Sequence, residues 1–145
     1  DCPPTLGILT VNALVAANSL LIPIQCEFFA LEGLSELMGT LRRVQQALNP
    51  ALEIEGVLLT MHDERLNLCN QIRQDVRSHF GNQVFETVVP RNVRLAESSG
   101  FGQPVLLYAV RSTGADSYLA LAREILRKPA TQQPVHASLS LGMAS

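Results

Sequence analysis

The chain has 145 residues, of which 47% are apolar and 17% are charged, and its formal net charge is −2. This length fits one globular domain with a real core and is too short for two. The small net charge excludes a global attraction to nucleic acid or membrane, so any DNA affinity must come from local basic clusters. The apolar stretches are broken by polar residues before they reach membrane-spanning length, and no secretory signal heads the chain.

Cysteine and histidine do not point to a metal site. The 3 cysteines form no CxxC pair, and the 3 histidines share no ligand spacing with one another or with a cysteine. An odd number of widely spaced cysteines suits a reducing cytoplasm.

The first half of the chain alternates between strand and helix patterns. Residues 20–24 are a short, nearly continuous apolar run, which is typical of a strand buried on both faces. Apolar residues then recur at helical spacing over residues 29–48. A second apolar strand is predicted over residues 54–61, followed by a polar-faced helix over residues 66–80 that ends at Gly81.

The second half continues the alternation. A third strand is predicted over residues 84–89 and is closed by Pro90. After a glycine-containing loop, residues 105–108 are expected to form a short extended piece, and residues 112–126 the last helix, with Ser112 as its N-cap. Residues 128–145 have no clear period and are expected to be a disordered tail.

This alternation predicts an α/β domain over residues 1–127, with a three-layer, mostly parallel sheet and flanking helices. Three strands are few for such a sheet, and a parallel sheet normally has both faces covered. We therefore expect further strands on the N-terminal side of the sequence given, which begins without Met.

Four segments carry a specific family resemblance. DCPPTLG at residues 1–7 resembles the DCPPSLG segment of ParA/Soj-type partition ATPases, which are deviant-Walker proteins of the MinD/ParA superfamily. IQCEFFALEGL at residues 24–34 is similar to their PxQCEYFALEGL segment. Residues 54–61 and 89–95 match further segments in the same order. The resemblance runs from residue 1 to about residue 126 and identifies the chain as the C-terminal portion of such an ATPase.

The resemblance implies that Asp1 is the Walker B residue, which holds a water molecule of a bound Mg²⁺ by hydrogen bonding. By itself, the DCPP sequence would be no more than a rigid turn. The phosphate-binding loop of the family, KGGxGKTT, is absent, because no GxxxxGK pattern occurs in the chain. Without it the chain is expected neither to hydrolyse ATP nor to bind it tightly, so ATP and Mg²⁺ are assigned to a longer parent.

Two turns are expected to border the nucleotide. Thr60 and Met61 end a strand where related P-loop proteins recognise the nucleobase, and in the family the segment of Pro90 and Arg91 lies beside adenine. Ligands gather at strand ends on this side of a parallel sheet. The alternative is that both are ordinary strand-terminating turns.

Two arginines are implied in DNA binding. Arg65 matches the arginine of the DARTNL segment of the family, and Arg94 that of PRNVRLSE. Exposed arginines that contact phosphate give sequence-blind, salt-sensitive affinity. The alternative is that they are solvated surface residues. Asp63, Glu64 and Glu97 lie near them in sequence and would weaken their field, so one protomer is expected to bind DNA weakly.

The sequence also departs from the family near Arg94. The segment at residues 96–104 loses a proline of the family, and Gln103 stands where the family has a lysine. The loss of a lysine removes one potential phosphate contact, so DNA binding is expected to be weaker than in the family.

Three functions remain open from the sequence. The first is an ATP-switched partition ATPase, cytoplasmic and nucleoid-associated, which forms a homodimer through nucleotide, binds nonspecific DNA and is released by a ParB-type centromere-binding protein. The second is a non-catalytic, truncated or degenerate homologue that binds DNA or a partner protein. The third is a MinD-like membrane-cycling ATPase, which is disfavoured because residues 130–145 contain no basic amphipathic helix.

Overall fold

The computed structural model describes residues 7–127, so Asp1 and the predicted tail at residues 128–145 lie outside the described residues. The elements in chain order are α1 (Ile8–Ala16), β1 (Ser19–Gln25), α2 (Ala30–Ala47), β2 (Glu53–His62), α3 (Asn67–Phe80), the short 3₁₀ helix η1 (Gly81–Gln83), β3 (Val84–Pro90), α4 (Val93–Gly100), α5 (Val105–Tyr108) and α6 (Thr113–Arg127).

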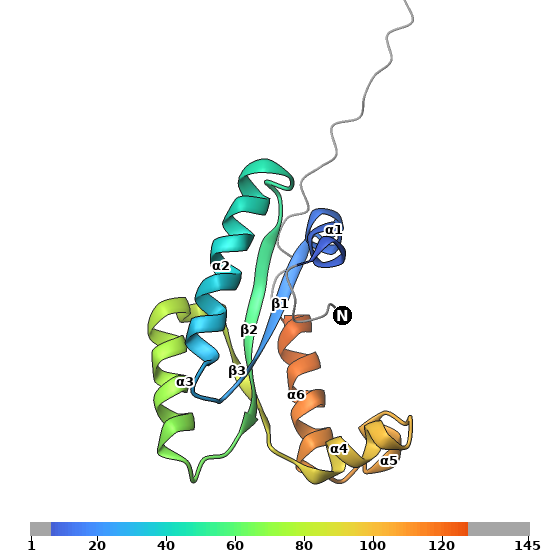
Figure 1. The fold of residues 1–145 in the computed structure, drawn as a ribbon. Helices are drawn as coiled ribbons and strands as arrows, with labels where there is room; N and C mark the ends of the chain where they lie inside the picture. The colour runs from blue at the N-terminus through green and yellow to red at the C-terminus, as the bar shows by residue number, and fades with distance from the viewer. Residues whose placement is uncertain (1–6, 128–145) are drawn as a thin grey trace, which may run out of the picture.

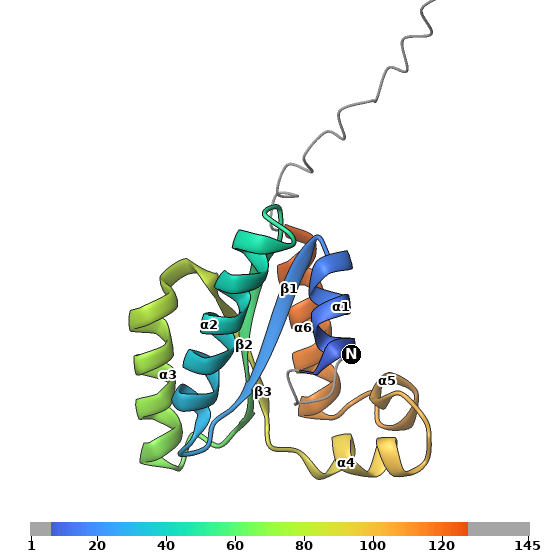
Figure 2. The same cartoon turned by 45° about the horizontal axis from the view of Figure 1, so that its top comes forward.

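The three strands form one parallel sheet in the order β1-β2-β3. Helices α2 and α3 lie on one face of this sheet, and α6 lies on the other (Figures 1 and 2). Helix α1 packs beside α2, where Leu14 joins Leu41 and Val44 in a small buried cluster. The prediction of a three-layer α/β fold is therefore confirmed. All three strands run the same way, so their carboxyl ends meet at one edge of the sheet.

The larger core lies between the sheet and helices α2 and α3. Its centre is formed by residues that are almost completely buried, among them Val57, Leu59, Cys69 and Val76. Strand β2 is central and covered on both faces, which is why its middle residues are apolar without alternation.

A second core lies between the sheet and α6. Phe85 is completely buried there, beside Leu58 and Leu121. The Phe85 ring passes over Gly56, where an added Cβ would stand 2.5 Å from Phe85 Cε2. A glycine in the middle of β2 is thus required by the close approach of this ring.

The outer edge of β3 is closed by α6. The backbone N–H groups of Glu86 and Thr87 donate to the two carboxylate oxygens of Glu124, at 2.7 and 2.9 Å. The strand register shifts between the β2 partners Val57 and Leu59, so β3 is irregular in this stretch. Glu124 satisfies donors that would otherwise invite pairing with another strand.

The predicted positions of the strands and main helices agree with the structure to within two residues at each end. Helix α3 ends at Gly81, whose φ is +50°, and the Ser112 hydroxyl accepts a hydrogen bond from the N–H of Ala115 at 3.1 Å, which confirms the predicted cap.

The prediction of an extended segment over residues 105–108 is wrong. This segment is the single helical turn α5, in which the N–H groups of Leu107 and Tyr108 donate to the carbonyl of Pro104, at 2.9 and 3.1 Å. The Tyr108 ring stacks on Phe101 with 5.4 Å between the ring centroids. Proline before the turn and this aromatic contact favour a helical turn over an extended run that has no neighbouring strand.

Helices α1 and α4 are additions to the predicted elements. The α1 sequence is apolar on nearly every side, so it lacks the amphipathic period by which a helix is recognised. Helix α4 has only 8 residues and begins behind Asn92, whose side chain accepts from the N–H of Arg94 at 2.8 Å.

Candidate functional site

The turns that follow the three strands lie at the same edge of the sheet. The N–H of Arg91 donates to the carbonyl of His62 at 3.0 Å, which joins the ends of β2 and β3. Arg91 also forms an ion pair with Glu27, which follows β1, although the two atoms are 3.8 Å apart and both side chains are largely exposed. The sheet thereby brings Arg91 together with residues that are 29 positions (His62) and 64 positions (Glu27) away in the sequence.

The residues predicted to border the nucleotide occupy two different environments. Thr60 uses its hydroxyl within the sheet, where it donates to the carbonyl of Ile24 at 3.1 Å. Met61 has a φ of +53°, the only positive φ outside glycine in the described part of the chain, and is 37% exposed. Such a conformation is uncommon for a residue with a side chain, so it marks a constrained backbone position at the end of β2.

A pocket of about 490 Å³ opens between the ends of β2 and β3 and the first turns of α6. It brings Pro90 and Arg91 together with Arg65, whereas Thr60, Met61 and Arg94 are not part of its wall. The wall consists of His62, Asp63, Glu64, Arg65, Val88, Pro90, Arg91, Thr113 and Ser117.

Three residues of this wall were missed by the sequence reasoning. His62 directly follows Thr60 and Met61 in the segment expected to border the base, but no role was predicted for its side chain. It is 5% exposed, and its Nε2 is the one buried side-chain nitrogen or oxygen in the described residues without a hydrogen-bond partner. Thr113 and Ser117 come from the start of α6. The Ser112 cap located that helix end, but only the tertiary fold places it beside β2 and β3.

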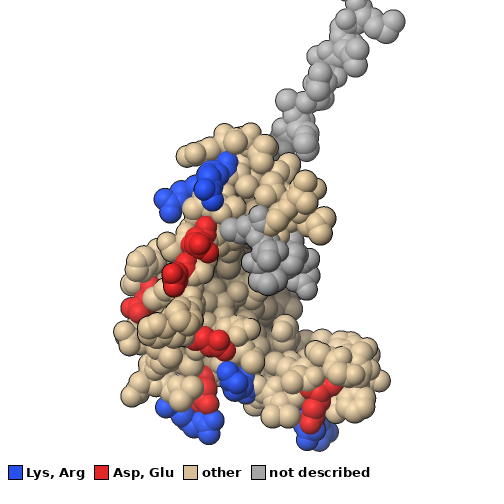
Figure 3. All heavy atoms as spheres, in the orientation of Figure 1, with Lys and Arg blue, Asp and Glu red and all other residues tan. Residues whose placement is uncertain are grey.

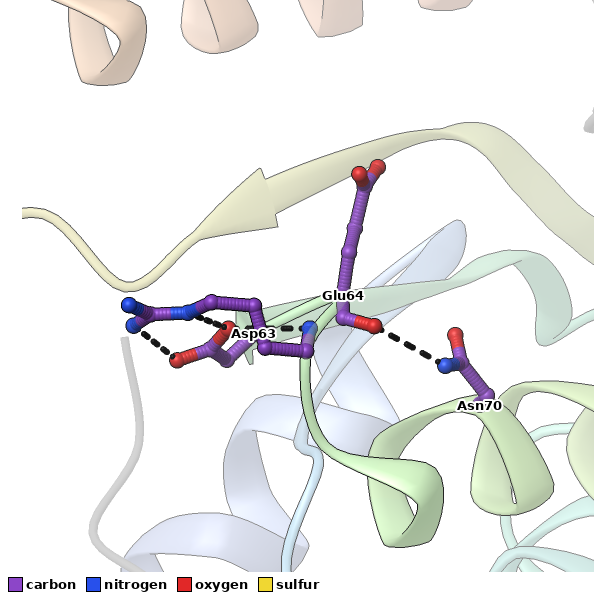
Figure 4. A network of polar contacts seen from close by, with 4 residues as sticks. Asp63, Glu64 and Asn70 are labelled. Atoms are coloured by element: carbon purple, nitrogen blue, oxygen red, sulfur yellow. Dashed lines mark hydrogen bonds and ion pairs between the residues drawn. The ribbon is translucent and has the colours of Figure 1, made fainter.

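Arg65 is held by the aspartate two positions before it. Asp63 Oδ1 accepts from the backbone N–H of Arg65 at 3.1 Å and from Nε at 2.9 Å, and Oδ2 accepts from Nη2 at 2.7 Å (Figure 4). These hydrogen bonds lower the pKa of the Asp63 carboxyl to about 2. The Arg65 side chain is nevertheless 87% exposed.

Arg94 lies apart from the pocket, in the first turn of α4. Its Nη1 forms an ion pair with Glu97 Oε2 at 2.7 Å, and the Tyr108 hydroxyl donates to the same oxygen at 3.3 Å. The hydrogen bond with Glu97 raises the pKa of Arg94 above its ordinary value. The Arg94 side chain remains 59% exposed.

The charge distribution matches these local pairs. Figure 3 shows basic and acidic side chains close together along the lower edge of the molecule, with no broad basic field on this face. An anion that approaches Arg65 or Arg94 would meet a single arginine beside a carboxylate.

The described residues contain no group of three or more histidine, cysteine, aspartate or glutamate side chains that could hold a metal ion. Cys26 and Cys69 are buried in the larger core, where the Cys69 thiol donates to the Cys26 carbonyl at 3.4 Å. Burial, and then the neighbouring Cys69, raise the pKa of Cys26 to about 11. A thiol that stays protonated is a poor nucleophile and ligand, so these cysteines act as core residues.

No helix among residues 7–127 has the length and apolar character needed to cross a membrane.

The known proteins most similar in sequence include ParA and Soj proteins of several bacteria. Residues 1–54 match the model of a family described as an AAA domain. The chain is 55% identical over 134 residues to the chromosome partitioning protein ParA of Myxococcus xanthus, covering 92% of this chain and 47% of that protein. It is 56% identical over 125 residues to the sporulation initiation inhibitor protein Soj of Bacillus subtilis, covering 86% of this chain and 49% of that protein.

Solved structures with the same fold include two ATPase-related proteins. Cobyrinic acid a,c-diamide synthase of Mycobacterium smegmatis aligns with a TM-score of 0.69 and 33% identity, over 88% of this chain and 45% of that one. The septum site-determining protein MinD of Pyrococcus horikoshii, solved with Mg-ADP, aligns with a TM-score of 0.69 at 22% identity, which supports the fold alone, over 88% of this chain and 49% of that one. The chain is thus a homologue of the ParA/Soj chromosome-partitioning proteins over most of its own length, and it spans about half the length of the curated relatives that it matches.

Proposed function

We propose that this chain is the C-terminal portion of an ATP-dependent DNA-partitioning ATPase. In the complete protein, nucleotide joins two subunits into a dimer that binds nonspecific DNA. A ParB-type centromere-binding protein then stimulates hydrolysis and releases the dimer, which is cytoplasmic and associates with the nucleoid. The observation that carries this proposal is identity above 50% with ParA and Soj proteins over about nine-tenths of the chain.

The strand-end pocket supports a nucleobase site in the complete protein. Its volume of about 490 Å³ is of the size that small-molecule sites have, and Val88 and Pro90 give it an apolar part. The Thr113 hydroxyl accepts from the Asn92 amide at 2.6 Å and can still donate, and the Ser117 hydroxyl donates to the Gly114 carbonyl at 2.8 Å and can still accept. Both can therefore help to orient a heterocycle. Arg91 lines the pocket and forms a loose ion pair with Glu27, at 3.8 Å.

The residues that would hold magnesium and the phosphates lie outside the described residues 7–127. The diamide synthase that shares 33% identity was solved with an ATP analogue and magnesium. In this chain the candidate for holding a Mg²⁺ water is Asp1, and the phosphate-binding lysine and glycines are absent from the sequence. The metal would stabilise charge on the phosphates, whereas the described residues contribute the base pocket and the arginines.

The DNA contact is assigned to Arg65 and Arg94. Both are exposed: Arg65 lies in the turn that follows β2, and Arg94 lies in the first turn of α4, and neither is used in the core. Their isolation from a larger basic field predicts weak binding by one protomer and a marked gain when a dimer presents four such arginines at once.

An ATPase assay on the complete protein tests this proposal. With Mg²⁺, the complete protein should hydrolyse ATP slowly and faster when DNA and the ParB-type partner are both present. The 145-residue chain should show no ATP binding by calorimetry. Absence of stimulated turnover in the complete protein would refute the assignment as a partition ATPase.

A non-catalytic module that binds DNA or a partner protein is the second candidate. The length of the product of the source gene distinguishes the two candidates. A longer product that contains KGGxGKT supports the ATPase, and a natural start near Asp1 supports the module.

A further inference from the structure

The guanidinium of Arg65 is engaged by a carboxylate that is itself fixed in place. Asp63 accepts three N–H groups from Arg65, at distances of 2.7 to 3.1 Å, and one of these is the backbone N–H. The backbone bond makes a local turn that positions the carboxylate whether or not the guanidinium is present. The Asp63 side chain is only 18% exposed, whereas the Arg65 side chain is 87% exposed.

The two donors taken by Asp63 form one of the two edges through which a guanidinium binds phosphate in a bidentate way. Arginine binds carboxylate and phosphate in the same way, through two parallel N–H···O bonds from one edge of the guanidinium. Here Nε and Nη2 both point at Asp63. Because hydrogen bonds from Arg65 keep the pKa of Asp63 near 2, the carboxylate is ionised under all physiological conditions and always competes.

The second arginine is engaged in a comparable way. Glu97 binds Arg94 at 2.7 Å, and the Tyr108 hydroxyl holds the same carboxylate oxygen at 3.3 Å. Each arginine assigned to DNA therefore faces a local carboxylate.

We propose that Asp63 is an intramolecular phosphate mimic, an autoinhibitory contact that competes with a DNA phosphate for the Nε–Nη2 edge of Arg65. This inference rests on the proposed function, because it takes Arg65 as a DNA contact. Exposed ion pairs are weak, so the contact lowers the affinity of each protomer by about two- to fivefold rather than abolishing it. Glu97 acts in the same way on Arg94.

The chain offers a matched control. Glu64 is the next residue in the same turn and carries the same charge, but Figure 4 shows its side chain pointing away from the guanidinium that Asp63 binds. Asp63→Asn and Glu64→Gln each remove one negative charge beside Arg65. Only the first removes the competing carboxylate, and the asparagine oxygen can still accept the backbone N–H of Arg65, so the turn is kept.

The experiment measures binding of the 145-residue chain to a random-sequence DNA duplex by fluorescence anisotropy at low salt. Asp63→Asn should tighten Kd about two- to fivefold, and Glu64→Gln should change it clearly less. In an Arg65→Ala background, Asp63→Asn should have no more effect than Glu64→Gln. Glu97→Gln should likewise tighten binding, and only when Arg94 is present.

The outcomes separate the inference from the function on which it rests. If Arg65→Ala weakens binding but Asp63→Asn equals Glu64→Gln, the phosphate-mimic inference is overturned and the DNA assignment stands. If Arg65→Ala leaves binding unchanged, or the chain does not bind the duplex at all, both are overturned. Circular dichroism spectra of each variant establish that the fold is retained, and the Glu97→Gln series gives a second, independent reading.

Discussion

The carboxylate that closes the edge of β3 is expected to be a main support of α6. In Glu124→Ala the N–H groups of Glu86 and Thr87 lose their acceptors, which are now 2.7 and 2.9 Å away. A hydrogen bond to a charged group contributes about 1.5–3 kcal/mol. The Glu86 N–H is solvent-exposed and can turn to water, so the expected total loss is about 1–3 kcal/mol of unfolding free energy.

Urea denaturation of the chain, followed by circular dichroism, measures this loss. Glu86→Gln is the matched control, because it removes a charge from the same edge while both N–H bonds to Glu124 remain. For a chain of this length the loss corresponds to roughly 2–4 °C in Tm for each kcal/mol. If Glu124→Ala costs no more than Glu86→Gln, the two bonds do not support the edge and the reasoning is refuted.

Three further predictions concern single positions. Gly56→Ala should destabilise the fold by about 1–3 kcal/mol, because its Cβ would stand 2.5 Å from the Phe85 ring; an unchanged urea midpoint would contradict this. The Asp63 carboxyl should titrate by NMR near pH 2, and near its ordinary value in Arg65→Ala. Because the pKa of Asp63 is lowered in the folded chain, its contribution to stability is present at pH values above its unfolded pKa and is lost as the pH falls through about 2. If Arg65→Ala left the NMR titration midpoint of Asp63 unchanged, the ion pair would be excluded. Cys26, with a pKa of about 11, should resist a thiol reagent at pH 8 in the native chain and react at once in urea; rapid native reaction would count against its burial.

The parts of the fold that follow from periodicity could be predicted from the sequence. The apolar run of β2 and the amphipathic pattern of α2 each have one physical explanation, a strand covered on both faces and a helix packed on one side. Helix α1 could not be predicted in this way, because a helix that is apolar on most sides has no period to detect. The α5 turn depends on contacts of Phe101 with Tyr108, which no local propensity contains.

The candidate site divides in the same way. Motifs located Arg65, Pro90 and Arg91, and the parallel sheet brings them to one pocket. The sequence also predicted that nearby carboxylates would weaken the basic field. The bidentate geometry of Asp63 on Arg65 is a property of the turn, and burial of His62 with an unpartnered Nε2 depends on the tertiary packing around the end of β2. Those two features can be seen only in the three-dimensional structure.

The central claim is that this chain supplies the DNA-binding arginines of a partition ATPase. The most direct test is the salt dependence of binding of a random-sequence duplex by the complete protein with ATP, compared with its Arg65→Ala/Arg94→Ala variant. The account predicts that log Kobs falls linearly with log salt and that the variant binds more weakly, with its slope reduced by about two for each subunit. A variant with the same affinity and the same slope would contradict the claim.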